Sequence, residues 1–396
     1  MDKQDILIAG FKASSIAAGL KKNNAADMAL IFSERKAVAA GVFTTNKVKA
    51  APVLVSMEHL IKGHARAIIA NAGNANACTG SEGFRNAGLT AELVARELGI
   101  NPEDVLIAST GVIGAQIDME KVGNAIPGLV KGLSSEKIPL AADAIMTTDS
   151  FAKISLFDGE AGGIPYRIAG IAKGAGMIMP NMATMLSFIL TDIEIEVLQL
   201  KRALSYAVER TFNRITVDGD TSTNDTVLVL ANGMAGNSPL NDSDYDGFTK
   251  GLQQVMNDLS NMIVKDGEGA TKQVFIYIKG AASEKDAIIA ARNVANSYLV
   301  KTAFYGQDAN WGRIMAALGR SGIVMDEKDI SILIDDIKIV DGGLGVGPDQ
   351  EKNAAERMKN RSFSLIIDLN KGGYEYNIIT CDLTHEYVSI NANYRT

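Results

Sequence analysis

The sequence predicts an α/β fold, in which strands and amphipathic helices alternate along the whole chain. Short apolar runs rich in β-branched residues are separated by longer stretches with apolar residues at helical spacing. Several of the short runs are apolar at nearly every position, which indicates sheets that are covered on both faces. No low-complexity tract, long linker or repeat of fixed length interrupts this alternation. The pattern favours a compact α/β body.

The expected strands are apolar runs bounded by turn-forming or charged residues. In chain order they span residues 28–33, 38–44, 67–72, 105–109, 187–190, 226–230, 274–278, 330–340 and 362–369. Near the end of the chain, Lys371-Gly372-Gly373 separates two alternating runs and predicts a hairpin turn between them.

The clearest expected helix begins after Ser283, which lies three residues before Asp286, as in a capped N-terminus. Apolar residues then recur at positions 287, 291, 294 and 298. Two further stripes have helical spacing, at positions 197, 200, 204 and 208 and at positions 248, 252, 255, 259 and 262. We interpret these faces as parts of the core and not as partner-binding surfaces.

Length and charge narrow the class of protein further. At about 150 residues per domain, 396 residues give between two and three units, and we expect two, although single α/β layers of this length also occur. The net charge is −7 and the basic residues are scattered, so we expect a small-molecule substrate and no nucleic-acid partner. Cys78 and Cys381 lie far apart, and the N-terminus has no signal-peptide pattern, so we expect a cytoplasmic protein.

One uncharged stretch, residues 174–191, approaches the length of a membrane-spanning helix. Gly174, Gly176, Pro180 and Asn181 would break or weaken a helix in its first half. We therefore expect a buried loop that leads into a strand, and no membrane partner.

The sequence lacks the residues that several common kinds of catalytic or binding site require. The only histidines are His59, His64 and His385, and none lies at metal-ligand spacing or suggests a Ser-His-Asp triad. The acidic stretch 218–225 lacks the glycine and the final carboxylate of a calcium loop, so we interpret it as a hydrogen-bonded turn near a pocket. No dinucleotide or Walker loop is present, and we expect no metal and no cofactor.

A glycine-rich and methionine-rich loop leads to Thr184 and suggests a self-cleavage site. A threonine becomes a strong nucleophile when its own α-amine is free, which requires cleavage of the preceding peptide bond. Ala183 supplies a small residue before that bond. Thr110 and Gly111 end an expected strand and are suitable oxyanion donors. The freed α-amine, with an ordinary pKa of about 7.7 to 8.0, would suit a general base.

An ordered series of motifs resembles the ornithine acetyltransferase family of arginine biosynthesis and covers the chain from end to end. The motifs are residues 41–46 (GVFTTN), 71–80 (NAGNANACTG), 109–111 (STG), 146–149 (MTTD), 173–186, 216–226 (TVDGDTSTNDT), 266–271 (DGEGAT), 306–313 (GQDANWGR) and 387–396 (YVSINANYRT). Each motif alone is weak evidence for a family, but the occurrence of all of them in this order is specific for this one. Asn393 and Arg395 are departures from the usual residues of the family.

The resemblance implies a layered αββα sandwich, similar to the N-terminal-nucleophile fold. It implies a precursor that cuts itself between Ala183 and Thr184 into chains 1–183 and 184–396. These chains would stay intertwined in one body and form a heterotetramer of two copies each.

The resemblance also implies the roles of individual residues. Thr184 would be the nucleophile, with Thr110 and Gly111 as the oxyanion hole. The substrate-binding residues would be Thr147, Lys173, Thr184, Glu268, Asn391 and Thr396. We infer that Lys173 suits the α-carboxylate of an acetylated amino acid and Glu268 suits the side-chain ammonium of ornithine.

The implied reaction is transfer of an acetyl group from N2-acetylornithine to glutamate through an ester on Thr184. Some family members also accept acetyl-CoA, and the sequence leaves that open. One alternative is an amidase or aminopeptidase that uses the same nucleophile with water as acceptor. A second alternative is a non-catalytic amino-acid sensor with an uncut loop.

Overall fold

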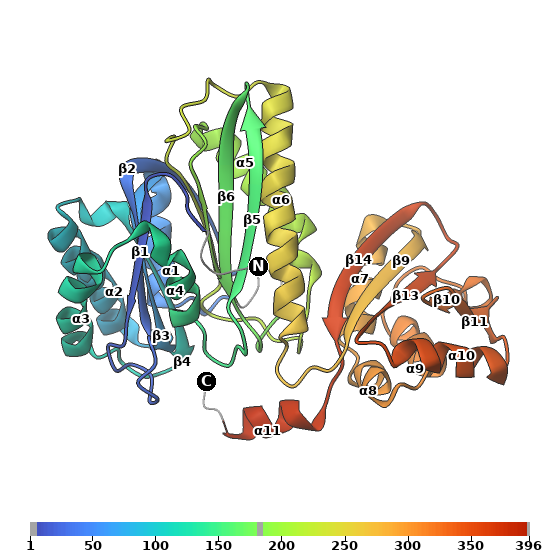
Figure 1. The fold of residues 1–396 in the computed structure, drawn as a ribbon. Coiled ribbons are helices and arrows are strands. Elements are labelled where there is room, and N and C mark those ends of the chain that lie inside the picture. The colour runs from blue at the N-terminus through green and yellow to red at the C-terminus, as the bar shows by residue number, and fades with distance from the viewer. Residues whose placement is uncertain (1–5, 180–184, 394–396) are drawn as a thin grey trace. The chain divides into compact units, whose positions relative to one another are not determined.

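The computed structural model describes residues 6–179 and 185–393. The chain forms two compact units. The first combines the chain up to Asn213 with Asp220–Ile263, and the second combines Arg214–Gly219 with the chain from Val264 onward. Each unit is built around its own sheet (Figure 1).

The first unit contains an eight-stranded sheet in the order β4-β3-β2-β8-β7-β6-β5, with β1 paired to β2. Its strands are β1 (Phe11–Ile16), β2 (Met28–Phe43), β3 (His64–Asn74), β4 (Val105–Val112), β5 (Lys153–Ala161), β6 (Ile164–Lys173), β7 (Leu186–Thr191) and β8 (Thr226–Ala231). The parallel pairs β3/β4 and β7/β8 are apolar on both faces, as the sequence predicts.

Strand β2 joins the two halves of this sheet. Its first half pairs with β3, its second half pairs with β8, and the register shifts between Phe32 and Ala37. A core that includes Ile31, Ile68, Phe188 and Leu228 draws on strands of both halves. The sheet therefore folds over so that its halves stack around a shared core. This confirms the expected layered α/β architecture.

Helices cover the outer faces of these layers (Figure 1). They are α1 (Ala51–His59), α2 (Gly80–Leu98), α3 (Met119–Lys131), α5 (Val197–Arg210) and α6 (Asp242–Lys265), whereas α4 (Ile138–Ala144) packs Ile138 and Ala142 into the shared core. Helices α2 and α3 bury Val94, Val122 and Leu129 against β3 and β4. Helix α6 packs so closely on β6 that a methyl group at Gly170 would lie 2.6 Å from Val255.

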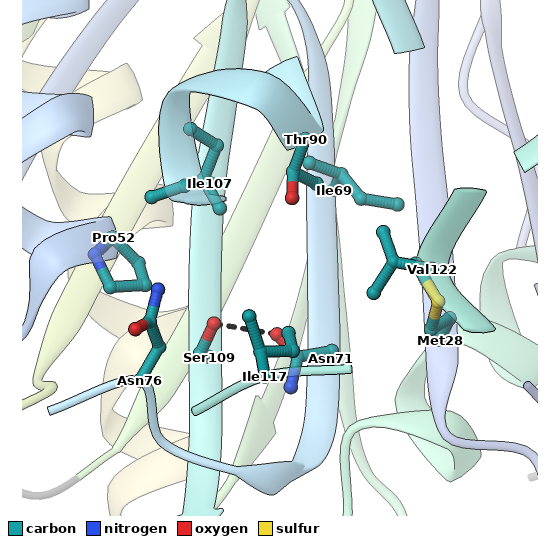
Figure 2. A pocket seen from close by; sticks show the side chains of 11 residues that line it. Met28, Pro52, Ile69, Asn71, Asn76, Thr90, Ile107, Ser109, Ile117 and Val122 are labelled. Atoms are coloured by element: carbon teal, nitrogen blue, oxygen red, sulfur yellow. Dashed lines mark hydrogen bonds between the residues drawn. The ribbon is translucent and has the colours of Figure 1, made fainter. Parts of the chain in front are cut away.

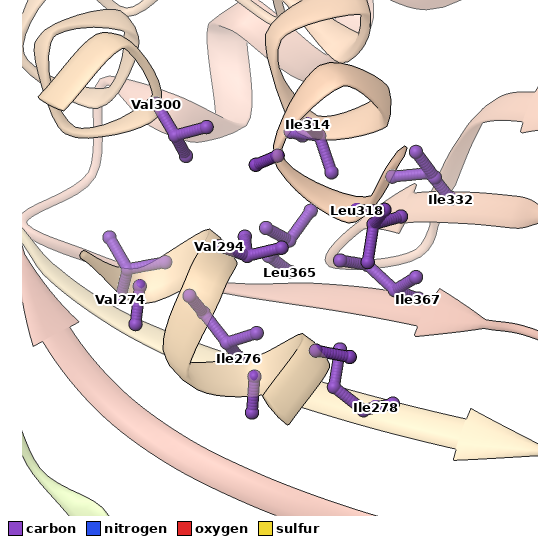
Figure 3. Close-up of a cluster of buried hydrophobic side chains, with 14 of the residues drawn as sticks. Val274, Ile276, Ile278, Val294, Val300, Ile314, Leu318, Ile332, Leu365 and Ile367 are labelled. Carbon is purple, nitrogen blue, oxygen red and sulfur yellow. The ribbon is translucent and has the colours of Figure 1, made fainter. Parts of the chain in front are cut away.

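The second unit contains a six-stranded sheet in the order β12-β11-β10-β13-β9-β14. Its strands are β9 (Gln273–Ala281), β10 (Ser331–Ile334), β11 (Ile337–Asp341), β12 (Leu344–Gly345), β13 (Ser362–Asp368) and β14 (Tyr374–Cys381), and its helices are α7 (Glu284–Ala295), α8 (Tyr298–Gly306), α9 (Trp311–Gly319), α10 (Pro348–Met358) and α11 (His385–Asn393). Side chains from the sheet and from α7, α8 and α9 form one apolar core, which includes Ile276, Val294 and Leu365 (Figure 3).

Most expected elements are present, and the differences have physical reasons. The side chain of Ser283 accepts a hydrogen bond from the Asp286 N–H and caps α7 as predicted. The expected strand 330–340 is two strands, because Asp335 adopts a positive φ of 51° and turns the chain.

The predicted hairpin at Lys371-Gly372-Gly373 is wrong, because β9 lies between β13 and β14 in the sheet. The N–H groups of Lys371 and Gly372 instead donate to the Gly280 carbonyl at the end of β9. The turn therefore carries the chain past the neighbouring strand.

Candidate active site

Three of the predicted site residues meet in the first unit. Lys173, the last residue of β6, is 5% exposed. Its Nζ donates to Oγ1 of Thr147 at 2.9 Å and to Oγ1 of Thr110 at 3.2 Å. Thr110 lies on β4, and Thr147 lies in the segment between α4 and β5. The sheet and its connections thus bring together motifs that are far apart in the sequence.

The carboxylate of Asp149 holds this cluster in place through hydrogen bonds. Its Oδ1 accepts hydrogen bonds from the Gly174 N–H at 2.6 Å and from Lys153 Nζ at 2.7 Å. Its Oδ2 accepts one from the Thr147 N–H at 3.0 Å. One carboxylate therefore fixes both Thr147 and the residue that follows Lys173.

The carboxylate of Asp149 is buried and lies close to two lysines. The side chains of Asp149 and Lys153 are both fully buried. Burial alone would raise the pKa of Asp149, but the positive charges of Lys173 and Lys153 hold it at about 2. Asp149 is therefore ionised at neutral pH. Asp149 lies in the motif 146–149, but no local pattern indicates a role for it or for Lys153, because only the fold brings both beside Lys173.

Gly111 lies where β4 meets β3, and only glycine fits there. Its φ is +131°, and an added Cβ would lie 2.4 Å from the backbone carbon of Gly73. Gly73 and Gly111 are register partners at an irregular point of this pair. The two strands approach so closely that the backbone after Thr110 adopts a conformation that other residues rarely reach.

The stretch 218–225, interpreted above as a rigid turn, is tied to the end of β4 by hydrogen bonds. Asn224 Nδ2 donates to the carbonyls of Ala75 at 2.7 Å and Ser109 at 2.8 Å. Thr44 Oγ1 donates to the Ser222 carbonyl. The turn thus braces the strand end that carries Thr110.

A small cavity lies beside the same strands and is not the substrate site. Its volume is about 10 Å³, room for about one water molecule. Ser109 Oγ donates to Asn71 Oδ1 at 2.6 Å on its wall (Figure 2). Apolar residues such as Ile69, Ile107 and Val122 form most of the rest. We interpret it as a packing defect next to a buried polar pair.

Asp225 is a buried carboxyl that no pattern in the sequence distinguishes from its neighbours. Its Oδ1 accepts a hydrogen bond from the Met185 N–H at 3.0 Å, and Ser222 also donates to the carboxyl. Its Oδ2 has no hydrogen-bond partner in the part of the chain that the structure describes. Burial raises the pKa of Asp225 well above its usual range, which outweighs the opposing influence of these donors and of Lys173.

Two further predicted residues meet in the second unit. Asn391 on α11 donates through Nδ2 to Glu268 Oε2 at 2.8 Å, and Glu268 is 9% exposed. The predicted substrate residues therefore form two clusters, one in each unit. Ala183, Thr184 and Thr396 lie outside the described residues.

In the layered α/β unit, the buried lysine at the end of β6 thus meets two threonine hydroxyls. The model of the ArgJ family matches residues 12–396. The "Arginine biosynthesis bifunctional protein ArgJ" of Geobacter sulfurreducens is 49% identical over 391 residues, which are 98% of this chain and 100% of that protein. The protein of the same name from Caldanaerobacter subterraneus is 47% identical over 393 residues, covering 98% and 97% of the two chains.

A crystal structure of the Bacillus halodurans protein with that name is 43% identical, with a TM-score of 0.51. The match covers 53% of this chain and 100% of that chain. The chain belongs to the ArgJ family, and the resemblance in its motifs is confirmed. It is an acetyltransferase-family enzyme of arginine biosynthesis.

Among the described helices, none combines the length and hydropathy needed to cross a bilayer.

Proposed function

We propose that this chain is a self-cleaving glutamate N-acetyltransferase that moves the acetyl group of N2-acetyl-L-ornithine to L-glutamate through an acetyl ester on Thr184. The observation that carries the proposal is the convergence of Lys173, Thr110 and Thr147 on one point. That point lies at the end of β6, from which the chain runs on to Ala183 and Thr184.

The reaction has two halves. Thr184 Oγ attacks the acetyl carbonyl of acetylornithine, the α-amine of Thr184 takes the hydroxyl proton, and ornithine leaves with a proton on its nitrogen. Glutamate then attacks the ester through its α-amine and releases Thr184. The product is N-acetylglutamate, and no cofactor is consumed.

The site residues supply binding and charge. The hydroxyl of Thr110 and the N–H of Gly111 stabilise the oxyanion. Lys173 and Thr147 bind the α-carboxylate that both amino-acid substrates carry. Glu268 and Asn391, with Thr396, bind the remaining polar groups, and Glu268 offers a counter-charge for the ornithine ammonium.

Cleavage between Ala183 and Thr184 gives chains of 183 and 213 residues (396 − 183 = 213). The larger chain is about 54% of the precursor, close to the 53% that the full-length match to the Bacillus halodurans chain covers. We extend the proposal to a cytoplasmic heterotetramer of two copies of each chain. We also extend it to acetyl-CoA as a second acetyl donor, which the family resemblance allows and with which the word bifunctional in the relatives' name agrees.

The test compares Thr184→Ala, Thr184→Ser and the wild type. The alanine variant should remain one chain and make no N-acetylglutamate, whereas the serine variant should retain part of both activities because its hydroxyl survives. Denaturing electrophoresis and product analysis measure the two outcomes. Cleavage of the alanine variant would contradict the mechanism, and an uncut wild type would favour the sensor alternative. Acetate as the main product would favour the amidase alternative.

A further inference from the structure

We propose that Asp225 is the proton donor for self-cleavage, an inference that rests on the proposed cleavage at Thr184. The first observation is its place. Asp225 Oδ1 is 3.0 Å from the Met185 nitrogen, and Met185 directly follows Thr184 in the chain. The carboxyl therefore contacts the backbone immediately after the proposed cleavage point, where a general acid for this reaction is needed.

The second observation is the unpaired oxygen. A buried oxygen without a hydrogen bond is costly, so native proteins keep few of them. Asp225 is 3% exposed, and its Oδ2 has no partner among residues 6–179 and 185–393. A protonated carboxyl with one oxygen free to donate fits this environment better than a carboxylate. Burial raises the pKa of Asp225 well above its usual range, which favours the protonated form.

The third observation is the strand pair that holds the carboxyl still. The Thr226 N–H donates to the Met185 carbonyl at 3.0 Å, and the Thr44 N–H donates to the Asp225 carbonyl. The backbone around Asp225 is thus fixed to both β7 and the end of β2. A donor fixed to the residue after Thr184 loses little entropy when the reaction begins.

The proposed step balances without an outside reagent. Thr184 Oγ forms a bond to the Ala183 carbonyl carbon, and the bond from that carbon to the Thr184 nitrogen breaks. Asp225 gives its proton to the departing nitrogen, and the proton lost by the hydroxyl restores the carboxyl. Water then hydrolyses the resulting ester, which leaves a carboxylate on Ala183 and restores the hydroxyl of Thr184.

The experiment follows cleavage of full-length precursor made by cell-free synthesis, for wild type, Asp225→Asn and Asp192→Asn. The asparagine at 225 can still accept from the Met185 N–H through Oδ1 but cannot donate an acidic proton. Asp192 is the matched control, since it follows β7 at its other end and accepts from the Arg167 N–H at 2.8 Å. Thermal melts verify that each variant folds.

We expect Asp225→Asn to cleave at least about 100-fold more slowly, the lower range for loss of a general acid, and Asp192→Asn to cleave like the wild type. The wild-type rate should fall as pH rises through the raised pKa of Asp225. Hydroxylamine, which cuts esters, should not cut the Asp225→Asn precursor, because the defect precedes ester formation.

Wild-type cleavage by Asp225→Asn, or an ester that accumulates in it, would overturn the inference. If Asp225→Asn does not fold, the pH dependence of the wild-type cleavage rate tests the proposal. A rate that does not fall with rising pH would contradict it. A wild type that stays uncut would contradict the proposed function itself. Equal cleavage of the wild type and Asp225→Asn would contradict only the role of Asp225.

Discussion

At the scale of single residues, the buried charges at the end of β6 explain how the candidate site is held. Lys173 contacts two hydroxyls, and Asp149 fixes the backbone on both sides of that contact. Lys153 balances the charge of Asp149 from within the core. Site chemistry and stability therefore depend on the same three side chains.

Replacing Lys173 with methionine should impair substrate binding more than self-cleavage. The variant keeps most of the side-chain volume but loses the charged hydrogen bonds to a carboxylate, about 1.5 to 3 kcal/mol. The KM for N2-acetylornithine should rise about 10- to 100-fold, as steady-state kinetics would report. Lys131→Met, at an exposed position of α3, is the control. An uncut precursor as the sole product of Lys173→Met would contradict this role.

Replacing Asp149 with asparagine should destabilise the protein by about 3 to 5 kcal/mol, because the buried charge of Lys153 would lose the carboxylate beside it. The double variant Asp149→Asn/Lys153→Met should recover much of that loss, since it removes both charges. Urea unfolding measures the free energies. Equal stability of the single and double variants would show that Asp149 does not offset the cost of burying the charge of Lys153.

The same pair makes stability depend on acid. The pKa of Asp149 is about 2 in the folded protein, below its ordinary 3.8, so its ionised form favours folding. This contribution, about 2 kcal/mol, is complete above about pH 4 and is lost as pH falls through about 2. As pH falls through that range, the wild type should therefore lose stability relative to the double variant. A difference that is constant with pH would contradict this interpretation.

At the scale of elements, the close contact of β3 and β4 sets the backbone at Gly111. Gly111→Ala would place a methyl group against the Gly73 backbone and force the strands apart. We expect it to reduce acetyl transfer at least about 100-fold, the usual loss when one oxyanion donor is displaced. Gly88→Ala, in α2 with open space around it, should instead stabilise the protein by about 0.5 to 1 kcal/mol. Normal transfer by Gly111→Ala would remove Gly111 from the oxyanion site.

The elements also show how far the sequence predicts the structure. Apolar periodicity and the Ser283 cap predict α7 because both signals are local. Lys371-Gly372-Gly373 was misleading because a local turn signal does not specify which strand pairs with which, and β9 separates the two runs. For the site, motif resemblance selected Lys173, Thr110 and Thr147. Asp149, Lys153 and Asp225 gain their roles from burial and distant neighbours, which no local pattern contains.

At the scale of the whole molecule, the proposed cleavage should not release the two chains. The bond between Ala183 and Thr184 lies between β6 and β7, which pair in one sheet from Ile168 with Thr191 to Lys173 with Leu186. Cleavage would leave this pairing and the shared core intact. We expect both fragments to elute together in native size-exclusion chromatography and to separate only under denaturing conditions. Separate native elution would contradict the intertwined arrangement.

The central claim, an acetyl group carried on Thr184, is tested most directly by intact-mass spectrometry of the purified protein after incubation with N2-acetylornithine. The chain that begins at residue 184 should gain the mass of one acetyl group and lose it when glutamate is added, with N-acetylglutamate formed in equal amount. An unmodified chain throughout a reaction that still yields N-acetylglutamate would contradict the account.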